Sequence, residues 1–199
     1  MIVAAVGVPV TWKRFSYYGD MFACPLAFAA VAGVSIEDNA SLVAWTAGLC
    51  AGLAIWPLIE YSFHRWIYHA CPVMRDFHAE HHERPSALLG APVMAIELLM
   101  LVVILAPLAA HHLGAAGGLT CGILAGYEFY MIVHHAGHHW KPQPGSYLYQ
   151  ARLRHAAHHY SGKAVNFGVT TSFWDRVFQT NSEPRGRFTV SSDPISSAR

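Results

Sequence analysis

Four long apolar segments lie in the first two thirds of the chain, at roughly residues 21–35, 42–60, 91–110 and 113–133. A helix that crosses a membrane needs about 20 predominantly apolar residues. The second and fourth segments fit this length best, whereas the first is short and the third contains Glu97. The pattern predicts an all-α integral membrane protein with about four transmembrane helices.

The polar segments between these helices predict how the protein is oriented. Four spans place residues 1–20, 61–90 and 134–199 on one side of the membrane, and every Lys and Arg falls on that side. The turns on the other side contain Glu37, Asp38 and the residues after Ala110. Because cytosolic segments are enriched in Lys and Arg, we expect both termini on the cytosolic side.

Composition agrees with a membrane protein, since 54% of the residues are hydrophobic and only 13% are charged. The 13 Lys and Arg nearly balance the 12 Asp and Glu, so we expect no nucleic-acid partner. The length fits a single membrane domain, which we place at residues 1–182. The small polar residues of 183–199 predict a disordered tail.

Histidine is the unusual component, because 12 of the 14 histidines fall within residues 64–82 and 134–159. The first window contains His78, His81 and His82 with the spacing HxxHH, and residues 155–159 repeat that spacing. Residues three or four apart share one face of a helix, so each HxxHH is expected to direct two imidazoles, or all three, toward one point. Both windows end at the cytosolic face, which predicts a cytosolic helical cap around a metal site. Ten ligands exceed the four that a zinc ion takes, and therefore favour two ions.

Spacing alone leaves two pairs in the second window unresolved. His134 and His138 have ligand spacing, and so do His135 and His139, but the two pairs point about 100° apart on a helix. The histidines at 111–112 lie at the opposite membrane face and are expected to be interfacial residues.

A carboxylate can orient a metal-binding imidazole through its second ring nitrogen. Asp76, Glu80 and Glu83 lie close enough in sequence to the first window for this role. Glu60 lies four residues before His64 and is a further candidate, although an ordinary helix cap or ion pair would explain it equally well.

The stretch GYEFYMIVHHAGHHWKPQPGSYLYQARLRHAAHHYSGKAVNFGVTTSFWDRVFQT opens with GY, carries GSYLY between its histidine groups, and closes with FG, WD and FxT. These features resemble fatty acid 2-hydroxylases, in the fatty acid hydroxylase and sterol desaturase superfamily. The resemblance extends over residues 60–180 and favours His134 and His138 over the neighbouring pair. It departs from the family between His69 and His78, where eight residues replace a longer insertion.

The resemblance implies a set of ten metal ligands, which are His64, His69, His78, His81, His82, His134, His138, His155, His158 and His159. It implies two iron ions with dioxygen as co-substrate. Zinc can replace iron in an isolated sample, because nitrogen ligands bind it more tightly than ferrous iron.

The implied activity is insertion of oxygen into a lipid C–H bond, with fatty acyl 2-hydroxylation the closest match. A desaturase, or a sterol or carotenoid hydroxylase, uses the same chemistry and stays open. A membrane zinc hydrolase is a more distant alternative, because it would be expected to show HExxH, which this chain lacks. A metal transporter would place its ligands near the membrane midplane rather than after the spans.

Such an oxygenase acts on a lipid or fatty acyl substrate among membrane lipids, and each hydroxylation consumes two electrons. The 199 residues contain no GxGxxG and leave little length for a haem module, so we expect an external donor of the cytochrome b5 or ferredoxin type. The region after the last span is basic, which suits an acidic donor, although anionic lipid head groups would explain the charge equally well. Its basic residues are Arg152, Arg154, Lys163, Arg176, Arg185 and Arg187.

Overall fold

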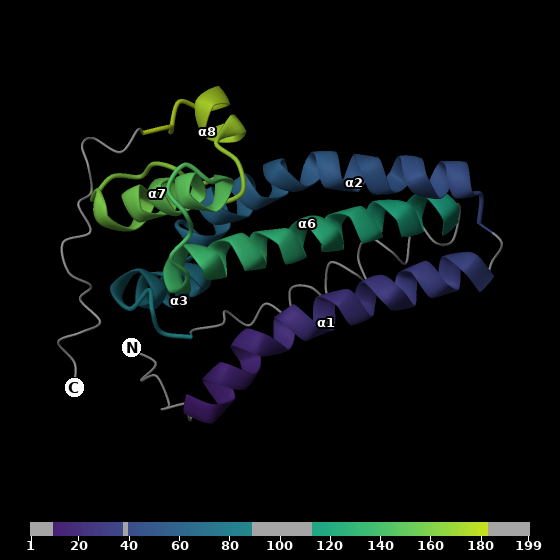
Figure 1. The fold of residues 1–199 in the computed structure, drawn as a ribbon, viewed down its shortest axis with the longest axis horizontal. Coiled ribbons are helices and arrows are strands. Elements are labelled where there is room, and N and C mark those ends of the chain that lie inside the picture. The colour runs from purple at the N-terminus through teal and green to yellow at the C-terminus, as the bar shows by residue number, and fades with distance from the viewer. Residues whose placement is uncertain (1–9, 38–39, 89–112, 183–199) are drawn as a thin grey trace.

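Among the residues that the structure describes, three long helices form the body of the protein (Figure 1). The structure is a computed structural model that describes residues 10–37, 40–88 and 113–182. The long helices are α1 (Val10–Glu37), α2 (Leu42–Ser62) and α6 (Leu113–His139). All three are apolar enough to cross a membrane, over Tyr17–Glu37, Leu42–Tyr68 and Gly114–His139. All regular secondary structure in the described part is helical, as predicted, and the expected span at 91–110 lies outside that part.

Two of these helices extend further than the apolar pattern indicated. The first expected span began at residue 21, but α1 begins at Val10 and its membrane-compatible part begins at Tyr17. The last expected span ended at residue 133, but α6 continues to His139. The extension of α6 places the second histidine window on the same rigid helix as the membrane span.

Glycines allow α2 and α6 to pack with their backbones in close contact. A Cβ atom at Gly52 would lie 2.9 Å from the Cα atom of Gly122, and the converse distance is also 2.9 Å. A Cβ atom at Gly118 would lie against the carbonyl oxygen of Trp45. Small residues at helix contacts of this kind are typical of membrane proteins, where close backbone approach supports association.

The shorter helices gather at one end of the long ones (Figure 1). They are the π-helix η1 (Phe63–Tyr68), which continues α2, and α3 (Pro72–Glu83), α7 (Tyr147–Tyr160) and α8 (Phe173–Val177). Pro72 occupies the first turn of α3, where its fixed φ suits a helix start, and the Ser146 side chain caps α7 by accepting from the Tyr149 amide. This arrangement brings together the two histidine windows, which are far apart in sequence.

Candidate metal centre

Ten histidines form two groups at the end of the long helices where α3 and α7 lie. The first histidine group consists of His64, His69, His78, His82 and His158. The second histidine group consists of His81, His134, His138, His155 and His159. Within each group, one ligand nitrogen per residue lies within 4.8 Å of all the others. These are the ten residues expected from the sequence, now placed in two sets of five.

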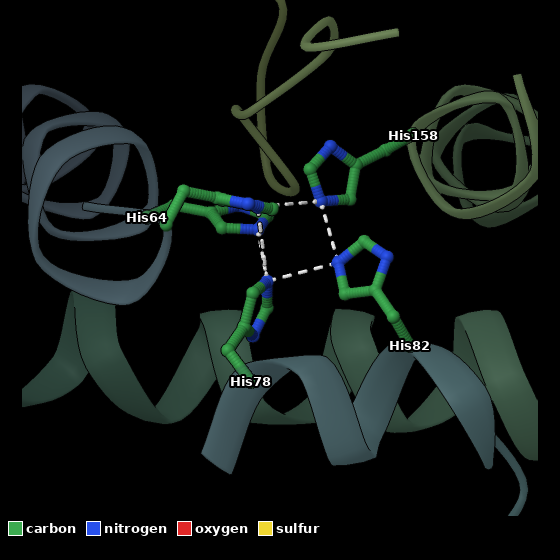
Figure 2. A group of neighbouring side chains, drawn as sticks. His64, His78, His82 and His158 are labelled. Carbon is green, nitrogen blue, oxygen red and sulfur yellow. Dashed lines mark hydrogen bonds between the residues drawn. The ribbon is translucent and has the colours of Figure 1, made fainter. Parts of the chain in front are cut away.

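The Nε2 atoms of each group point toward a common centre. Figure 2 shows four rings directed at one another: those of His78 and His82 from α3, that of His64 from η1 and that of His158 from α7. The Nε2 atom of His82 lies 3.0 Å from the Nε2 atoms of His78 and His158. Five imidazole nitrogens around one point suit a divalent transition metal better than a hard cation such as Mg²⁺ or Ca²⁺, which prefers oxygen ligands.

The HxxHH motif of α3 contributes to both groups. His78 and His82, four residues apart, join the first group, while His81 joins the second. On α7 the arrangement is reversed: residues 155 and 159 join the second group and His158 joins the first. The sequence expectation that two imidazoles of each motif share one point is therefore met, and the third imidazole reaches the adjacent group rather than the same one.

The π-helix explains how His64 and His69 can belong to one group although they are five residues apart. In an α-helix of 3.6 residues per turn, residues five apart point in different directions. In a π-helix the hydrogen bond runs between residues five apart, so such residues lie nearly one above the other. The π-helix at Phe63–Tyr68 thus brings the two rings together, with centroids 5.3 Å apart and an interplanar angle of 27°.

Backbone carbonyls orient two ligands of the first group. The Nδ1 atom of His64 lies 2.6 Å from the carbonyl oxygen of Phe167, and the Nδ1 atom of His158 lies 2.8 Å from that of Val165. A carbonyl oxygen can only accept, so each Nδ1 carries the proton and donates it. Each Nε2 is then left with a free lone pair directed at the centre, which is the form that binds a metal.

Burial keeps the histidines outside the membrane spans neutral at pH 7. Desolvation, with a smaller contribution from neighbouring imidazoles, lowers the pKa of His81 and of His82 to about 4. Desolvation also lowers the pKa of His158 to about 3, although its hydrogen bond to Val165 acts in the opposite direction. Neutral imidazoles are the protonation state required of metal ligands.

Three of the four carboxylates considered as orienting partners bind other groups. Asp76 pairs with Arg75, at 3.4 Å, and Glu80 pairs with Arg84. Glu60 is buried, but its carboxylate accepts from the backbone amides of residues 169 and 170. The sequence leaves Glu60 open as a partner of His64, but the Nδ1 atom of His64 lies against the carbonyl oxygen of Phe167 instead.

The sequence interpretation missed two buried polar residues beside the site, Asn166 and Asp175. Asp175 accepts hydrogen bonds from the amides of Phe167 and Gly168, and Asn166 has a left-handed backbone with φ of 54°. The signal was present as the FG and WD motifs, but those motifs entered only as marks of resemblance. The spacing between the FG and WD motifs matches neither a helical nor a strand period, so it did not reveal that the two motifs are in contact.

The alternative histidine pair of α6 faces away from both groups and toward α1. The Tyr17 hydroxyl lies 2.8 Å from Nδ1 of His135, and the rings of His135 and His139 stack with centroids 4.5 Å apart. His134 and His138 are the pair placed in the second group, as the resemblance indicated. The histidines at 111–112 lie outside the described residues.

Comparisons with known proteins agree with this geometry. Residues 49–180 match the family model described as fatty acid hydroxylase. The chain is 34% identical to fatty acid 2-hydroxylase of Rattus norvegicus over 141 residues, which cover 65% of this chain and 38% of that protein. It is 30% identical to the ceramide very long chain fatty acid hydroxylase scs7 of Schizosaccharomyces pombe over 190 residues, which cover 87% of this chain and 49% of that protein. The chain thus spans less than half the length of these relatives.

One solved structure has a similar fold. It is described as full length scs7p with only the hydroxylase domain visible, and it superposes with a TM-score of 0.72 at 27% sequence identity. The similarity covers 85% of this chain and 68% of the other.

Proposed function

Because the chain belongs to the fatty acid hydroxylase family, we propose that it uses dioxygen and two iron ions to hydroxylate a fatty acyl chain, at C2. The observation that carries the proposal is the pair of five-histidine groups at the end of the membrane helices. Fatty acid 2-hydroxylases of mammals and a ceramide hydroxylase of yeast are among its relatives, which supports this substrate class.

The donor set fits two iron ions. All ten side chains are imidazoles, so each ion would be held by neutral nitrogen and keep its full charge. Bound iron would supply the reaction with dioxygen that breaks an unactivated C–H bond, which no side chain here can perform. The protein's own part is to hold the ten Nε2 atoms in place, to keep them unprotonated, and to present the centre at the membrane surface.

An apolar groove on the membrane-spanning helices supports a lipid substrate. The groove has a volume of about 400 Å³ and is lined by residues of α2 and α6, by the first residue of α7 and by residues 170 and 171. Its lining consists of Leu53, Trp56, Pro57, Gly126, Phe129, Tyr147, Thr170 and Thr171. An acyl chain that enters this groove from the bilayer would keep its methylenes in apolar surroundings. Burial of each methylene contributes about 0.8 kcal/mol.

The proposal includes an external reductant and a cytosolic location for the centre. Each hydroxylation needs two electrons, which the imidazoles do not provide. Arg152, Arg176 and Lys163 lie in the described region after the last span and suit an acidic donor of the cytochrome b5 or ferredoxin type. Purified iron-loaded protein with lipid substrate and oxygen should turn over repeatedly only when a reduced donor is added, and sustained turnover without one would contradict the mechanism.

The central test is expression in a host that lacks such enzymes, followed by lipid mass spectrometry. We expect fatty acyl chains that have gained one oxygen atom at C2, and no product with the His81→Ala variant. His139→Ala removes a histidine outside both groups and serves as the matched control, which should retain product. Chains that had instead lost two hydrogen atoms would replace hydroxylation by desaturation, and oxygen at another carbon would remove the C2 assignment.

A further inference from the structure

A loop at residues 165–171 connects the first histidine group to two buried carboxylates. We call these residues the carbonyl loop, because the carbonyl oxygens of Val165 and Phe167 accept from the Nδ1 atoms of His158 and His64. The loop follows α7 and precedes α8. It has no regular hydrogen-bonding pattern of its own, so other groups must fix the positions of its carbonyls.

Asp175 holds the first half of the carbonyl loop. Its side chain, 1% exposed, accepts from the Phe167 amide at 2.9 Å and from the Gly168 amide at 2.8 Å. The Thr180 hydroxyl donates to the same carboxylate at 2.7 Å, which fixes its orientation. A Cβ atom at Gly168 would lie 2.9 Å from Oδ2 of Asp175, so the glycine permits this close approach.

Glu60 holds the second half in the same manner. Its side chain, 4% exposed, accepts from the Val169 amide at 2.6 Å and from the Thr170 amide at 2.9 Å, and the Thr170 hydroxyl donates to its other oxygen. Glu60 precedes His64 by four residues, one helical turn. The Glu60 carboxylate and the His64 imidazole therefore form hydrogen bonds to the same loop from successive turns of one helical segment.

Two carboxylates thus accept from four successive amides, at residues 167–170. Hydrogen bonds to charged groups are stronger than those between neutral groups. The carbonyl of Phe167 belongs to the peptide unit whose amide, that of Gly168, is bound by Asp175. Fixing that peptide plane fixes the direction of the carbonyl, and so the orientation of the His64 ring.

The second histidine group has a weaker support of this kind. The Nδ1 atoms of His155 and His159 are buried and have no hydrogen-bond partner within the part of the chain that the structure describes. An imidazole whose outer nitrogen is not held is less well oriented, and a poorer ligand. The two metal positions are therefore unequal in how firmly their ligands are set.

We propose that Glu60 and Asp175 are positioning residues that act through the carbonyl loop on the first histidine group alone, so that this group binds its ion more tightly than the second. The inference rests on the proposed two-ion centre. The two metal positions would then differ in affinity, although each offers five imidazole ligands.

The test measures metal affinity separately at each group, with zinc ion as the probe. A first-group reporter carries His138→Ala and His159→Ala, which leaves the first group complete, and a second-group reporter carries His69→Ala and His78→Ala. Zinc affinity is measured for each by competition with a chelator of known affinity and by metal analysis. The first-group reporter should bind zinc more tightly than the second-group reporter.

Asp175→Asn is then added to each reporter. Loss of an outer hydrogen-bond partner typically lowers metal affinity about 10- to 100-fold. We expect a loss of at least about tenfold in the first-group reporter and less than about twofold in the second. Asp76→Asn makes the same chemical change at an exposed carboxylate paired with Arg75, and should leave both affinities unchanged.

Equal losses in both reporters, each still folded, would overturn the inference, because Asp175 would then support the whole centre rather than the first group, and so would an unchanged first-group affinity. Thr180→Val keeps the test decisive where Asp175→Asn does not fold, since it removes only the hydroxyl that orients Asp175 and should lower first-group affinity by a smaller factor. The number of zinc ions bound by the unmodified chain separates failure of this inference from failure of its premise, the two-ion centre. Fewer than two zinc ions per chain would refute the two-ion centre, whereas two ions with equal responses to the variants would refute only the positioning role.

Discussion

Each histidine of the centre has two ring nitrogens with different roles, and burial keeps the imidazole in the neutral form that both roles require. The Nε2 atoms face the centre, and the Nδ1 atoms of His64 and His158 donate to carbonyls. Protonation would convert an Nε2 ligand into a donor and would place like charges about 3 Å apart in one group. Desolvation opposes that change, so the apolar surroundings keep the site able to bind metal without any acidic residue among its ligands.

The stability of the metal-free protein should therefore fall in mild acid. The pKa of His81 and of His82 drops from its ordinary 6.5 to about 4 in the folded protein, chiefly through desolvation. Between these values the unfolded chain binds protons that the folded protein does not, so the two groups lower the free energy of unfolding as the pH falls from 6.5 to 4, and their effect is small above 6.5. Thermal unfolding midpoints of metal-free protein across this range test the expectation. A variant with His81→Gln and His82→Gln should show a shallower decline, and an equal decline would contradict the assignment.

The ten histidines could be anticipated at the residue scale because helical spacing is a local property. The grouping could not, because membership depends on the relative rotation of α3, α6 and α7. The role of Asp175 could not be predicted for a different reason. Its carboxylate accepts hydrogen bonds from the amides of an irregular loop, and such a loop has no periodic sequence pattern.

At the scale of the elements, the position of the centre depends on how closely α2 approaches α6. α2 leads into η1, which carries His64, and α6 carries His134 and His138. Gly52 and Gly122 face each other at the contact, and a Cβ atom on either would lie 2.9 Å from the Cα atom of the other. Any side chain there must push the two helices apart, and would shift ligands of both groups.

Gly122→Ala should consequently lower the thermal unfolding midpoint. Overpacking of this type costs about 1–3 kcal/mol. Gly33→Ala is the matched control, because nothing lies within 4 Å of the Cβ atom it would add to α1. In a helix interior that change should be neutral or should stabilise by up to about 1 kcal/mol. A Gly122→Ala protein as stable as the Gly33→Ala protein would contradict the close packing.

The apolar pattern predicted the long helices well, because burial in a membrane requires long uninterrupted apolar segments. It underestimated α1, since Tyr17 and Tyr18 at its membrane end are less apolar than the segment beyond them. It did not reveal the π-helix after α2. The clue was the five-residue spacing of His64 and His69, which no α-helix would place on one face.

At the scale of the whole molecule, the structure separates an apolar body from a polar end. The shorter helices lie together at one end of the long helices (Figure 1), and the two histidine groups lie at that same end. Arg75, Arg84 and Lys141, among the basic residues of the described part, lie in the segments that follow the spans. The opposite end is formed by the end of α1, the start of α2 and the start of α6 (Figure 1). If basic residues mark the cytosolic side, an impermeant reagent should distinguish the two ends.

Single cysteines provide that test. Cys24 and Cys121 are buried, so Cys50→Ser with Cys71→Ser gives a background with low reactivity. In that background, Ala115→Cys lies at the start of α6 and Gln150→Cys on α7, and both positions are exposed. We expect an impermeant maleimide applied to intact cells to label Ala115→Cys, and to label Gln150→Cys only after the membrane is permeabilised. The reverse pattern would place the metal centre outside the cytosol and exclude a cytosolic electron donor, while labelling of both from one side would contradict the spanning arrangement of α6.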